Sequence, residues 1–301
     1  MRTCKQGMPT VHNVYNQDCI SGMREHVEDG SVDLIFTDPP YGIDGDKLDA
    51  HYNRDENNVV PGYVEVPLET YGEFSQQWIA ECARCLRPGG SMYIVSGYTN
   101  LHHVLNALHS TDLQEINHII AKYSFGVSTK RKFVSSHYHV LFWQKPDKGK
   151  QKRTFNTNVY YTDQKDSYHD RLTVQDMPRA HNPGQVKNKN QLSEDFIEKF
   201  VMYSSNSGDT VMDPFCGGFT TARTALRYSR NFVGFEMNKN AYDAFLPTLD
   251  SVDVLPEPTP VSPDPQELAK REKMREGWRQ DRKKKKQTHT VFDSVFQRPA
   301  K

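Results

Sequence analysis

A short apolar run that stops at two consecutive prolines constrains this chain more than any other feature of its sequence. Residues 34–36, Leu-Ile-Phe, form the kind of run that makes a buried parallel strand. Asp38-Pro39-Pro40-Tyr41 follows almost at once. Two prolines in a row cannot continue a sheet ladder, so the chain must leave the sheet at the carboxyl end of this strand, where open α/β sheets bind their ligands. The sequence therefore predicts a carboxylate, a fixed backbone carbonyl and an aromatic ring at one crevice.

The composition predicts a globular protein without a membrane span. The 301 residues carry 38 basic and 38 acidic side chains and are 36% hydrophobic, and the longest apolar runs are only a few residues. Residues 1–10 contain no apolar segment of the kind found in signal peptides. The five cysteines are an odd number scattered along the chain, which argues against a disulfide framework. We therefore expect a soluble, intracellular and cytoplasmic protein.

Helical and strand patterns alternate along the chain, which is typical of a doubly wound α/β sheet. Residues 68–86 repeat apolar side chains at helical spacing, and Leu86-Arg87-Pro88-Gly89-Gly90 predicts a turn into a strand at 91–96. Two further strands are expected within 116–144, and a helix is expected to open at Ser193. The predicted fold class is a doubly wound, Rossmann-like α/β sheet.

Two pairs of residues invite a metal-site interpretation. Cys82 and Cys85 form a Cys-x-x-Cys pair, but helical spacing places both thiols on the apolar face of a helix, which favours core packing. His137 and His139 lie two residues apart on an expected strand, with no third ligand in view. No metal site is therefore predicted.

A second strand that ends in a glycine turn predicts a ligand site. Residues 208–212 read as a strand, and Asp213-Pro214-Phe215-Cys216-Gly217-Gly218 leads from it toward a helix at 221–229. The paired glycines let the backbone approach a ligand, and the free N–H groups of a helix start suit an anion. About twenty residues past the turn, the strand 231–235 is followed by Glu236, a position that receives ribose hydroxyls in nucleoside-binding α/β folds. The alternative for Glu236 is a surface acid at a strand end.

The first motif resembles the catalytic motif of the amino-group DNA methyltransferases, which methylate the exocyclic nitrogen of adenine or cytosine. The lone pair of an exocyclic amine is delocalised into the ring, so the nitrogen becomes a nucleophile when acceptors bind its N–H groups. The Asp38 carboxylate and the Pro39 carbonyl supply such acceptors, and Tyr41 offers a ring on which an extruded base stacks. The resemblance implies a catalytic site made of Asp38, Pro39, Pro40 and Tyr41.

The second motif is similar to the cofactor motif of the same family, Asp-Pro-Phe-x-Gly, which stands here at 213–217 and implies S-adenosylmethionine (SAM) as methyl donor. The catalytic motif precedes the cofactor motif, as in the β group of the family. In the family an aspartate shortly before the catalytic motif contacts the adenine of the cofactor, whereas the residues alone suggest equally that Asp18 caps a helix at 21–27. The implied cofactor residues are Asp18, Cys19, Asp213, Phe215, Cys216, Gly217, Gly218, Thr220 and Glu236.

Two stretches depart from the family pattern. Gly218-Phe219 stands where a Ser-Gly pair is commoner. His181-Asn182-Pro183-Gly184 stands where the family often has His-Pro-Thr-x-Lys-Pro. A changed cofactor affinity or an altered cofactor pocket is the expected consequence, and no contact to the methionine end of the cofactor is assigned.

Three polar segments suggest contacts with nucleic acid. Residues 44–66 lack periodicity and are expected to form a loop that closes over the base or the DNA. Lys130, Arg131 and Lys132 form a cationic turn between two strands, which suits either phosphate contact or a solvated surface. Residues 145–190 are basic and rich in tyrosine, and the family places its target-recognition segment there.

The sequence changes character beyond residue 250. Five prolines between 256 and 265 indicate a stiff linker, and residues 266–301 contain twelve basic and five acidic side chains, a net charge of +7. Such an arm suits nucleic acid, and a solubilising charged helix is the alternative. We therefore expect a catalytic domain at 1–250, a proline-rich linker at 251–265 and a basic tail at 266–301.

Together, the residues and the resemblance predict a site-specific DNA adenine methyltransferase that transfers a methyl group from SAM to N6 of a flipped adenine in double-stranded DNA. Aspartate at the first motif position favours adenine, because cytosine-specific relatives more often carry serine there. The alternatives are a cytosine-N4 enzyme, an RNA or protein-amide methyltransferase, and an inactive DNA-binding protein of the same fold. The sequence is compatible with a homodimer and with a restriction endonuclease partner in a restriction–modification system, and it carries no specific signal for either.

Overall fold

The computed structural model describes most of the chain between residues 10 and 257. The described residues are 10–43, 65–124, 130–131, 133–149, 151–157, 171–177, 191–257, 269–270, 273–274 and 276–277. The chain divides into two units, Met1–Thr157 with Arg171–Pro258, and Asn158–Asp170 with Thr259–Lys301. Of the second unit, the structure describes six residues, all helical and exposed. The fold and the candidate site belong to the first unit.

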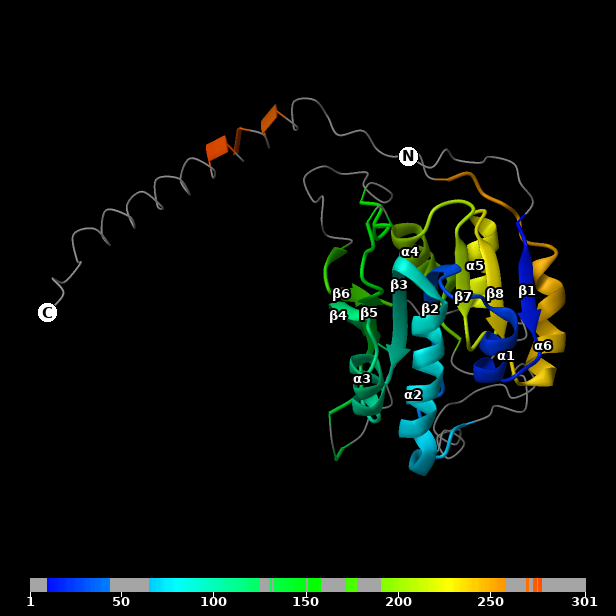
Figure 1. Ribbon diagram of the computed structural model, residues 1–301. Helices are drawn as coiled ribbons and strands as arrows, with labels where there is room; N and C mark the ends of the chain where they lie inside the picture. The colour runs from blue at the N-terminus through cyan, green and yellow to red at the C-terminus, as the bar shows by residue number, and fades with distance from the viewer. Residues whose placement is uncertain are drawn as a thin grey trace, which may run out of the picture. The chain divides into compact units, whose positions relative to one another are not determined.

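A mixed sheet forms the centre of the first unit (Figure 1). Its strands are β1 (His12–Tyr15), β2 (Val32–Thr37), β3 (Leu86–Ser96), β4 (Gln114–Lys122), β5 (His137–Gln144), β6 (Val174–Asp176), β7 (Thr210–Asp213) and β8 (Asn231–Phe235). The strand order is β1-β8-β7-β2-β3-β5-β4-β6. Neighbouring strands are parallel except that β5 is antiparallel to both β3 and β4. The predicted doubly wound α/β class is confirmed.

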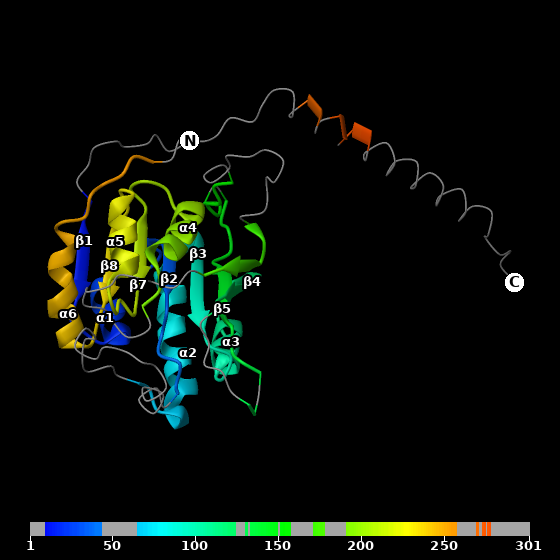
Figure 2. The same cartoon turned by 180° about the vertical axis from the view of Figure 1, so that it is seen from behind.

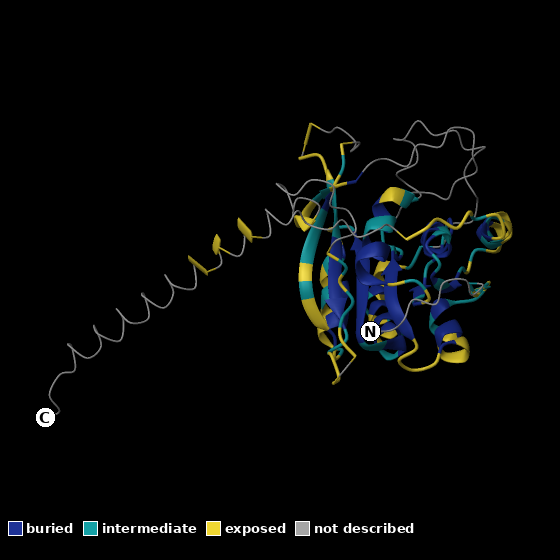
Figure 3. Cartoon of the chain, turned by 90° about the horizontal axis from the view of Figure 1, so that it is seen from above, coloured by how far each residue is buried: buried dark blue, intermediate teal, exposed yellow. Residues whose placement is uncertain are grey.

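Helices cover both faces of this sheet (Figures 1 and 2). One face carries α1 (Cys19–His26), α2 (Leu68–Cys85) and α3 (Leu101–His109), and the other carries α4 (Glu194–Ser204), α5 (Thr220–Arg227) and α6 (Lys239–Phe245). Successive strand residues enter opposite layers, so Ile35 packs in the core with Trp78 of α2 whereas Phe36 packs in the core with Phe200 of α4. Because both faces are covered, every residue of β2 is buried, and the central strands are dark blue in Figure 3.

Most predicted elements agree with the structure to within a few residues. The helix expected at 68–86 is α2, and the helix expected to open at Ser193 is α4, with Ser193 as its N-cap. The two strands expected within 116–144 are β4 and β5. None of the described helices is long and apolar enough to cross a bilayer.

The turn expected at Leu86-Arg87-Pro88-Gly89-Gly90 is wrong, because β3 begins at Leu86 directly after α2. The Gly89 N–H donates to the carbonyl of Lys145 at 3.0 Å, and the Lys145 N–H donates to the carbonyl of Gly90 at 2.9 Å. Gly89 has a φ of +75°, and a Cβ there would lie 2.7 Å from the backbone of Lys152. The register between β2 and β3 shifts at this point. Pairing with a distant segment therefore overrides the local turn signal.

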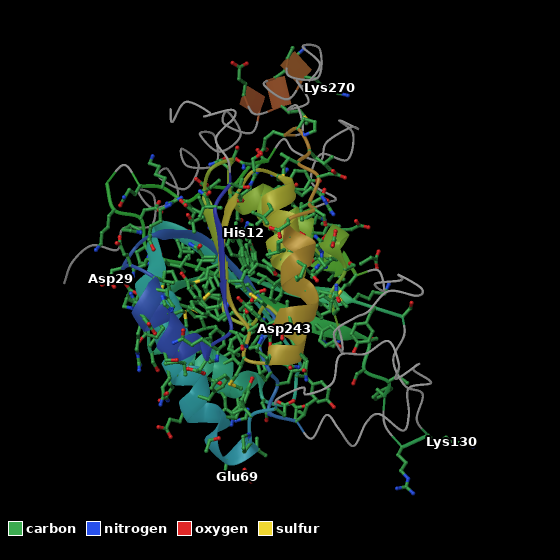
Figure 4. The ribbon with its side chains drawn as sticks, turned by 90° about the vertical axis from the view of Figure 1, so that its right-hand side faces the viewer. His12, Asp29, Glu69, Lys130, Asp243 and Lys270 are labelled. Carbon is green, nitrogen blue, oxygen red and sulfur yellow. The ribbon has the colours of Figure 1, made fainter. Side chains whose placement is uncertain are left out.

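The two ends of the folded core meet at the amino edge of the sheet. The Nε2 atom of His12, at the start of β1, lies 3.8 Å from Oδ1 of Asp250, which follows α6 (Figure 4 labels His12). The fully buried Arg230, directly before β8, donates to the carbonyl of Ser205 at 2.9 Å and forms an ion pair with Glu257. The start of the expected linker is thereby fixed to the edge of the sheet opposite the carboxyl ends of the parallel strands.

Candidate active site

The sheet changes its winding direction between the neighbouring strands β2 and β7. From β7 the chain passes through α5 to β8 on one side, and from β2 it passes through α2 to β3 on the other. In open α/β sheets, ligands bind outside the carboxyl ends of the strands at such a switch point. The two sequence motifs follow β2 and β7, so the fold brings them together although Thr37 and Asp213 are 176 residues apart.

A hydrogen bond joins the two motifs at this point. Thr37 Oγ1 donates to Asp213 Oδ1 at 2.7 Å, and both side chains are buried. The same carboxylate oxygen accepts the N–H of Phe215 at 3.0 Å. Burial raises the pKa of Asp213 to about 6, although hydrogen bonds from Thr37, Thr221 and the Phe215 backbone oppose the shift. Asp213 therefore links the end of β2 to the turn of the second motif.

Asp38 follows Thr37 and is half-buried. The hydroxyl of Tyr41 donates to Asp38 Oδ1 at 2.5 Å. Burial raises the pKa of Asp38 to about 7, and the nearby Asp213 adds to the rise, whereas the Tyr41 bond opposes it. The Tyr41 ring contacts the ring of Tyr138 at the start of β5, with centroids 6.0 Å apart. A carboxyl group that titrates near neutrality at a ligand-binding edge is a candidate for chemistry.

Two side chains that the sequence analysis did not single out hold the backbone after Pro39. The Tyr71 hydroxyl of α2 donates to the carbonyl of Pro40 at 2.9 Å. Nδ2 of Asn100 donates to the carbonyl of Tyr41 at 2.7 Å and to the carbonyl of Gly42 at 2.8 Å. A tyrosine in an amphipathic helix and an asparagine before a helix carry no local signal for this role.

The chain returns to the first motif at Glu65. The Gly42 N–H donates to Oε1 of Glu65 at 2.8 Å, so the two ends of the loop expected at 44–66 meet beside the motif. Residues 44–64 themselves lie outside the described part of the chain. Pro39 is buried, and none of the described residues donates a hydrogen bond to its carbonyl. Among the four carbonyls from Pro39 to Gly42, this is the one to which none of the described residues donates.

Glu236 and the glycine turn lie together at the end of β8. Oε2 of Glu236 accepts the N–H of Gly217 at 2.7 Å, and Oε1 accepts the N–H of Asn238 at 2.7 Å. Burial raises the pKa of Glu236, and the two backbone donors oppose that shift. A carboxylate has about four acceptor positions, so this one can still receive hydroxyl groups of a ligand. Glu236 thus binds the glycine turn, and its role toward the ribose stays a prediction.

The departure at Gly218-Phe219 has a packing explanation. Phe219 is the N-cap of α5 and adopts a φ of 57°, a left-handed conformation in which glycine is usual. Its ring is fully buried near Tyr242 and Phe245 of α6, with centroids 6.3 and 6.2 Å away. Burial of the ring offsets the backbone strain. Thr220, the first residue of α5, is also buried, which limits its side chain as a ligand contact.

The remaining cofactor candidates before the first motif have structural roles. Oδ1 of Asp18 accepts the N–H groups of Ile20 at 3.1 Å and Ser21 at 3.0 Å, so Asp18 caps α1 as one of its two interpretations expects. Cys19 is buried in the core, as is Cys216 in the second motif. Burial raises the pKa of both thiols well above the usual range, which keeps both protonated. Asp18 still lies at the carboxyl edge of the sheet, and a cofactor contact there stays a prediction.

The cationic turn leaves the sheet at the edge that carries the two motifs. β4 runs in the same direction as β2, so its connection to β5 begins at the carboxyl edge. Lys130 and Arg131 are exposed, and Figure 4 shows Lys130 pointing away from the body at the end where Glu69 lies near the start of α2. Lys132 lies outside the described residues. The two described cations therefore face solvent on the side of the candidate site.

The expected recognition segment is described only in part. Residues 145–149, 151–157 and 171–177 belong to the first unit, and β6 adds a strand beside β4. Residues 158–170 and 178–190 lie outside the described part, as do most residues after 257. The expected roles of this segment and of the basic tail stay predictions.

No group of three or more His, Cys, Asp or Glu side chains among the described residues has the geometry of a metal centre. Cys82 and Cys85 are both buried in the core, which confirms the packing interpretation. Nδ1 of His139 lies 2.7 Å from Nε2 of His118, and burial lowers the pKa of His139 to about 4, with added repulsion from His118 and His137.

Comparison with known proteins finds DNA methyltransferases. The family model of the N6 and N4 DNA methylases matches residues 32–246. The type II methyltransferase M.BamHI of Bacillus amyloliquefaciens is 29% identical over 249 residues, which are 74% of this chain and 54% of that protein. M.HpaI of Haemophilus parainfluenzae is 31% identical over 242 residues, which are 75% of this chain and 71% of that protein. The chain thus spans about half the length of M.BamHI.

A solved structure shares the fold. The crystal structure of M1.HpyAVI in complex with SAM aligns with a TM-score of 0.56 and 21% sequence identity, over 80% of this chain and 100% of that one. At this identity the alignment shows the shared architecture alone.

Proposed function

This chain belongs to the DNA methylase family, and we propose that it transfers a methyl group from SAM to the N6 amino group of an adenine turned out of double-stranded DNA. The observation that carries the proposal is the hydrogen bond from Thr37 to Asp213, which holds the Asp38 motif beside the glycine turn after β7. A nucleophile bound at the first motif and a methyl donor bound at the second would then lie at adjacent strand ends.

The residues of the second motif suit SAM. Glu236 keeps acceptor positions for two ribose hydroxyls, and Gly217 next to it carries no side chain that would obstruct the nucleoside. Asp18 lies at the carboxyl edge of the sheet, near the end of β1, and is proposed to face the adenine of SAM. Bound there, SAM supplies an electrophilic methyl group on its sulfonium. The protein contributes position and electrostatics, and no covalent intermediate with the chain is needed.

The first motif suits an exocyclic amine. Oδ1 of Asp38 receives the Tyr41 hydroxyl, so Oδ2 is proposed to accept one amine hydrogen and the Pro39 carbonyl the other. By accepting these two hydrogens, both groups reduce the delocalisation of the nitrogen lone pair into the ring. The lone pair can then be directed at the methyl group. After transfer the nitrogen carries a surplus proton, and a carboxylate with a pKa of about 7 is a suitable acceptor for it.

Aspartate at the first motif position supports adenine over cytosine. The same two acceptors serve the N4 amine of cytosine equally well on chemical grounds, which makes cytosine-N4 methylation the second candidate. The exposed Lys130 and Arg131 at the same edge support a polyanionic substrate, and double-stranded DNA is proposed as that substrate.

Product analysis tests the proposal. Purified protein is incubated with SAM and unmethylated DNAs of varied sequence, and the DNA is digested to nucleosides for mass spectrometry. N6-methyladenine is the expected product. Detection of N4-methylcytosine would contradict adenine as the target base and support the second candidate, cytosine-N4 methylation. Absence of both products, on all DNAs, would contradict DNA methylation, and the same assay with RNA and with protein substrates would then identify the acceptor.

An Asp38→Ala variant controls for contaminating activity. Methyl transfer is expected to fall below detection, whereas SAM affinity measured by calorimetry stays within about twofold, because Asp38 belongs to the first motif. Full activity in this variant would sink the catalytic role of Asp38.

A further inference from the structure

Asn100 occupies the N-cap of α3, yet its side chain does not cap that helix. Asparagine is among the preferred N-cap residues because its side-chain oxygen accepts an N–H group of the first turn. No such bond forms in α3, and the side chain is only 7% exposed. A buried side-chain amide needs hydrogen-bond partners. Because the amide of Asn100 does not bind its own helix, its partners lie elsewhere, at Tyr41 of the first motif and at Gly42 directly after it.

The Asn100 amide binds two successive peptide groups. Its nitrogen donates to the carbonyls of Tyr41 at 2.7 Å and Gly42 at 2.8 Å, which uses both of its hydrogens. Carbonyl oxygens only accept, so the nitrogen rather than the oxygen of the amide must face them. One side chain on α3 thus fixes the path of the chain directly after the catalytic motif.

Tyr71 holds the carbonyl of Pro40, one residue before those that Asn100 binds. Its hydroxyl donates to the Pro40 carbonyl at 2.9 Å, and its ring lies against Gly42, where a Cβ would come within 2.7 Å of the ring. Gly42 has a φ of +65°, so both the backbone conformation and the ring select glycine. Burial, together with the carboxylates of Glu65 and Asp38, raises the pKa of Tyr71 far above its usual value. Its hydroxyl therefore stays protonated and remains a donor.

We propose that Asn100 and Tyr71 are positioning residues for methyl transfer, which orient the two amine acceptors by binding each backbone carbonyl from Pro40 to Gly42. This inference rests on the proposed function of Asp38 and Pro39. Tyr71 and Asn100 come from α2 and α3, and each helix is anchored in the core by its own apolar face. The carbonyl of Pro39, at the start of the same turn, is then held in one orientation, while each of the next three carbonyls is already bound by a side chain.

Asn100→Ser separates positioning from stability. Serine is a preferred N-cap but is too short to reach both carbonyls, so α3 should keep its start while the bonds to Tyr41 and Gly42 are lost. We expect kcat to fall about 100-fold, as for a misplacement of about 1 Å, with SAM affinity within about twofold of wild type. Tyr71→Phe removes a single hydroxyl, and kcat should fall about tenfold.

Val104→Ala is the matched control. Val104 is fully buried on α3, and its aliphatic side chain has no donor or acceptor with which to bind the backbone of the first motif. Its truncation therefore lowers stability through packing. Its kcat is expected to stay within about threefold of wild type. A fall in kcat equal to that of Asn100→Ser would assign the effect to general destabilisation. Retention of kcat within about threefold in Asn100→Ser would equally overturn the positioning role.

Hydrogen exchange gives a readout that does not depend on activity. The bonds from Asn100 end on the carbonyls of Tyr41 and Gly42, so their loss should loosen the turn that presents the Gly42 N–H to Glu65. The Gly42 amide should therefore exchange at least about tenfold faster in Asn100→Ser than in wild type, and at the wild-type rate in Val104→Ala. Unchanged exchange in Asn100→Ser would refute the restraint whatever the reaction. An inactive wild type with the expected exchange pattern would contradict the proposed function alone. An active wild type with a fully active Asn100→Ser variant would contradict the positioning role alone.

Discussion

Thr37 and Asp213 share a hydrogen bond of 2.7 Å between the last residues of two adjacent strands, β2 and β7. Thr37 directly precedes the first motif and Asp213 opens the second, so this one bond sets the separation of the two motifs at the carboxyl edge. Because the bond is buried and ends on a carboxyl group, its contribution should depend on pH.

Thr37→Val removes the donor and keeps the shape of the side chain. Asp213 has a pKa of about 6, so at pH 8 it is ionised and would lose one of its donors. The free energy of unfolding is expected to fall by about 1–3 kcal/mol at pH 8 and by less at pH 5, where the carboxyl group is mostly protonated. Urea unfolding at both pH values measures the difference. Thr37→Ser keeps the hydroxyl and serves as control, and a loss independent of pH would speak against an ionised partner.

The rate of methyl transfer should follow the ionisation of Asp38. Only the carboxylate accepts the amine hydrogen, and the pKa of this group is about 7. The value of kcat/KM is therefore expected to rise about tenfold per pH unit below pH 7 and to level off above it. Initial rates between about pH 5.5 and 9 provide the profile, and a profile without a break near neutrality would remove Asp38 as the titrating group.

The same raised pKa lowers the stability of the folded protein at neutral pH. Folded Asp38 keeps its proton up to about pH 7, whereas an unfolded aspartate releases it near pH 4. The folded state binds more protons between these values, so the contribution of Asp38 to stability is complete below about pH 4 and is lost as the pH rises through 7. Asp38→Asn should therefore be more stable than wild type at pH 8 by about 1–2 kcal/mol, after allowance for partial exposure, while being inactive. Urea unfolding at pH 4 and pH 8 checks the direction.

Glu236→Gln should weaken SAM binding by about tenfold or more with little effect on kcat at saturating SAM. Both carboxylate oxygens accept backbone N–H groups, from Gly217 and Asn238. An amide in this place turns an NH₂ group toward one of these donors and loses acceptors for ribose hydroxyls. Calorimetry measures the affinity. Asp243→Asn, an exposed acid on α6, is the control, and equal affinities in the two variants would exclude Glu236 from the cofactor site.

Substitutions of Phe219 should reverse the usual order of glycine and alanine. The residue has a φ of 57° and a fully buried ring. Loss of the ring costs about 3–5 kcal/mol in either variant. Glycine relieves the left-handed strain that alanine retains, so Phe219→Gly should be more stable than Phe219→Ala by about 1 kcal/mol. Urea unfolding gives both values, and an alanine variant as stable as the glycine variant would show that the backbone there is unstrained.

Replacement of Lys130 and Arg131 by alanine should weaken DNA binding without changing SAM affinity. If both cations contact phosphate, the slope of log K against log salt should become smaller by about 2. Fluorescence anisotropy with labelled DNA over a range of salt gives the slope. Lys148→Ala, an exposed cation at the opposite edge of the sheet, should leave it unchanged. An unaltered slope in the double variant would contradict phosphate contact and support the alternative that this turn is a solvated surface.

Local signals predict the elements of this fold well and their contacts poorly. The apolar run before Pro39, the glycine turn after Asp213 and the helical spacing of residues 68–85 are properties of short segments, and each element exists as expected. The failure at Gly89 has the opposite origin, because its conformation is set by pairing with Lys145, more than fifty residues away.

Asn100 and Tyr71 show why part of the site could not be predicted. Each has a plausible local interpretation, Asn100 as a helix cap and Tyr71 as an apolar helix residue. Their bonds to the carbonyls of Pro40, Tyr41 and Gly42 exist only once α2 and α3 are docked on the sheet. Asp18 illustrates the converse, because the cap is a local property and is present as one interpretation expected.

The contact between His12 and Asp250 has a consequence for how such a chain can be connected. Nε2 of His12 and Oδ1 of Asp250 lie 3.8 Å apart near the two ends of the folded core, so a short peptide that joins those ends would close the core into a ring. Opening that ring between Thr157 and Arg171 would give a circular permutant in which Asp213 precedes Asp38 along the chain while the bond between Thr37 and Asp213 is kept. The order of the two motifs is thus a property of where the chain is cut and not of the geometry on which the proposed chemistry depends.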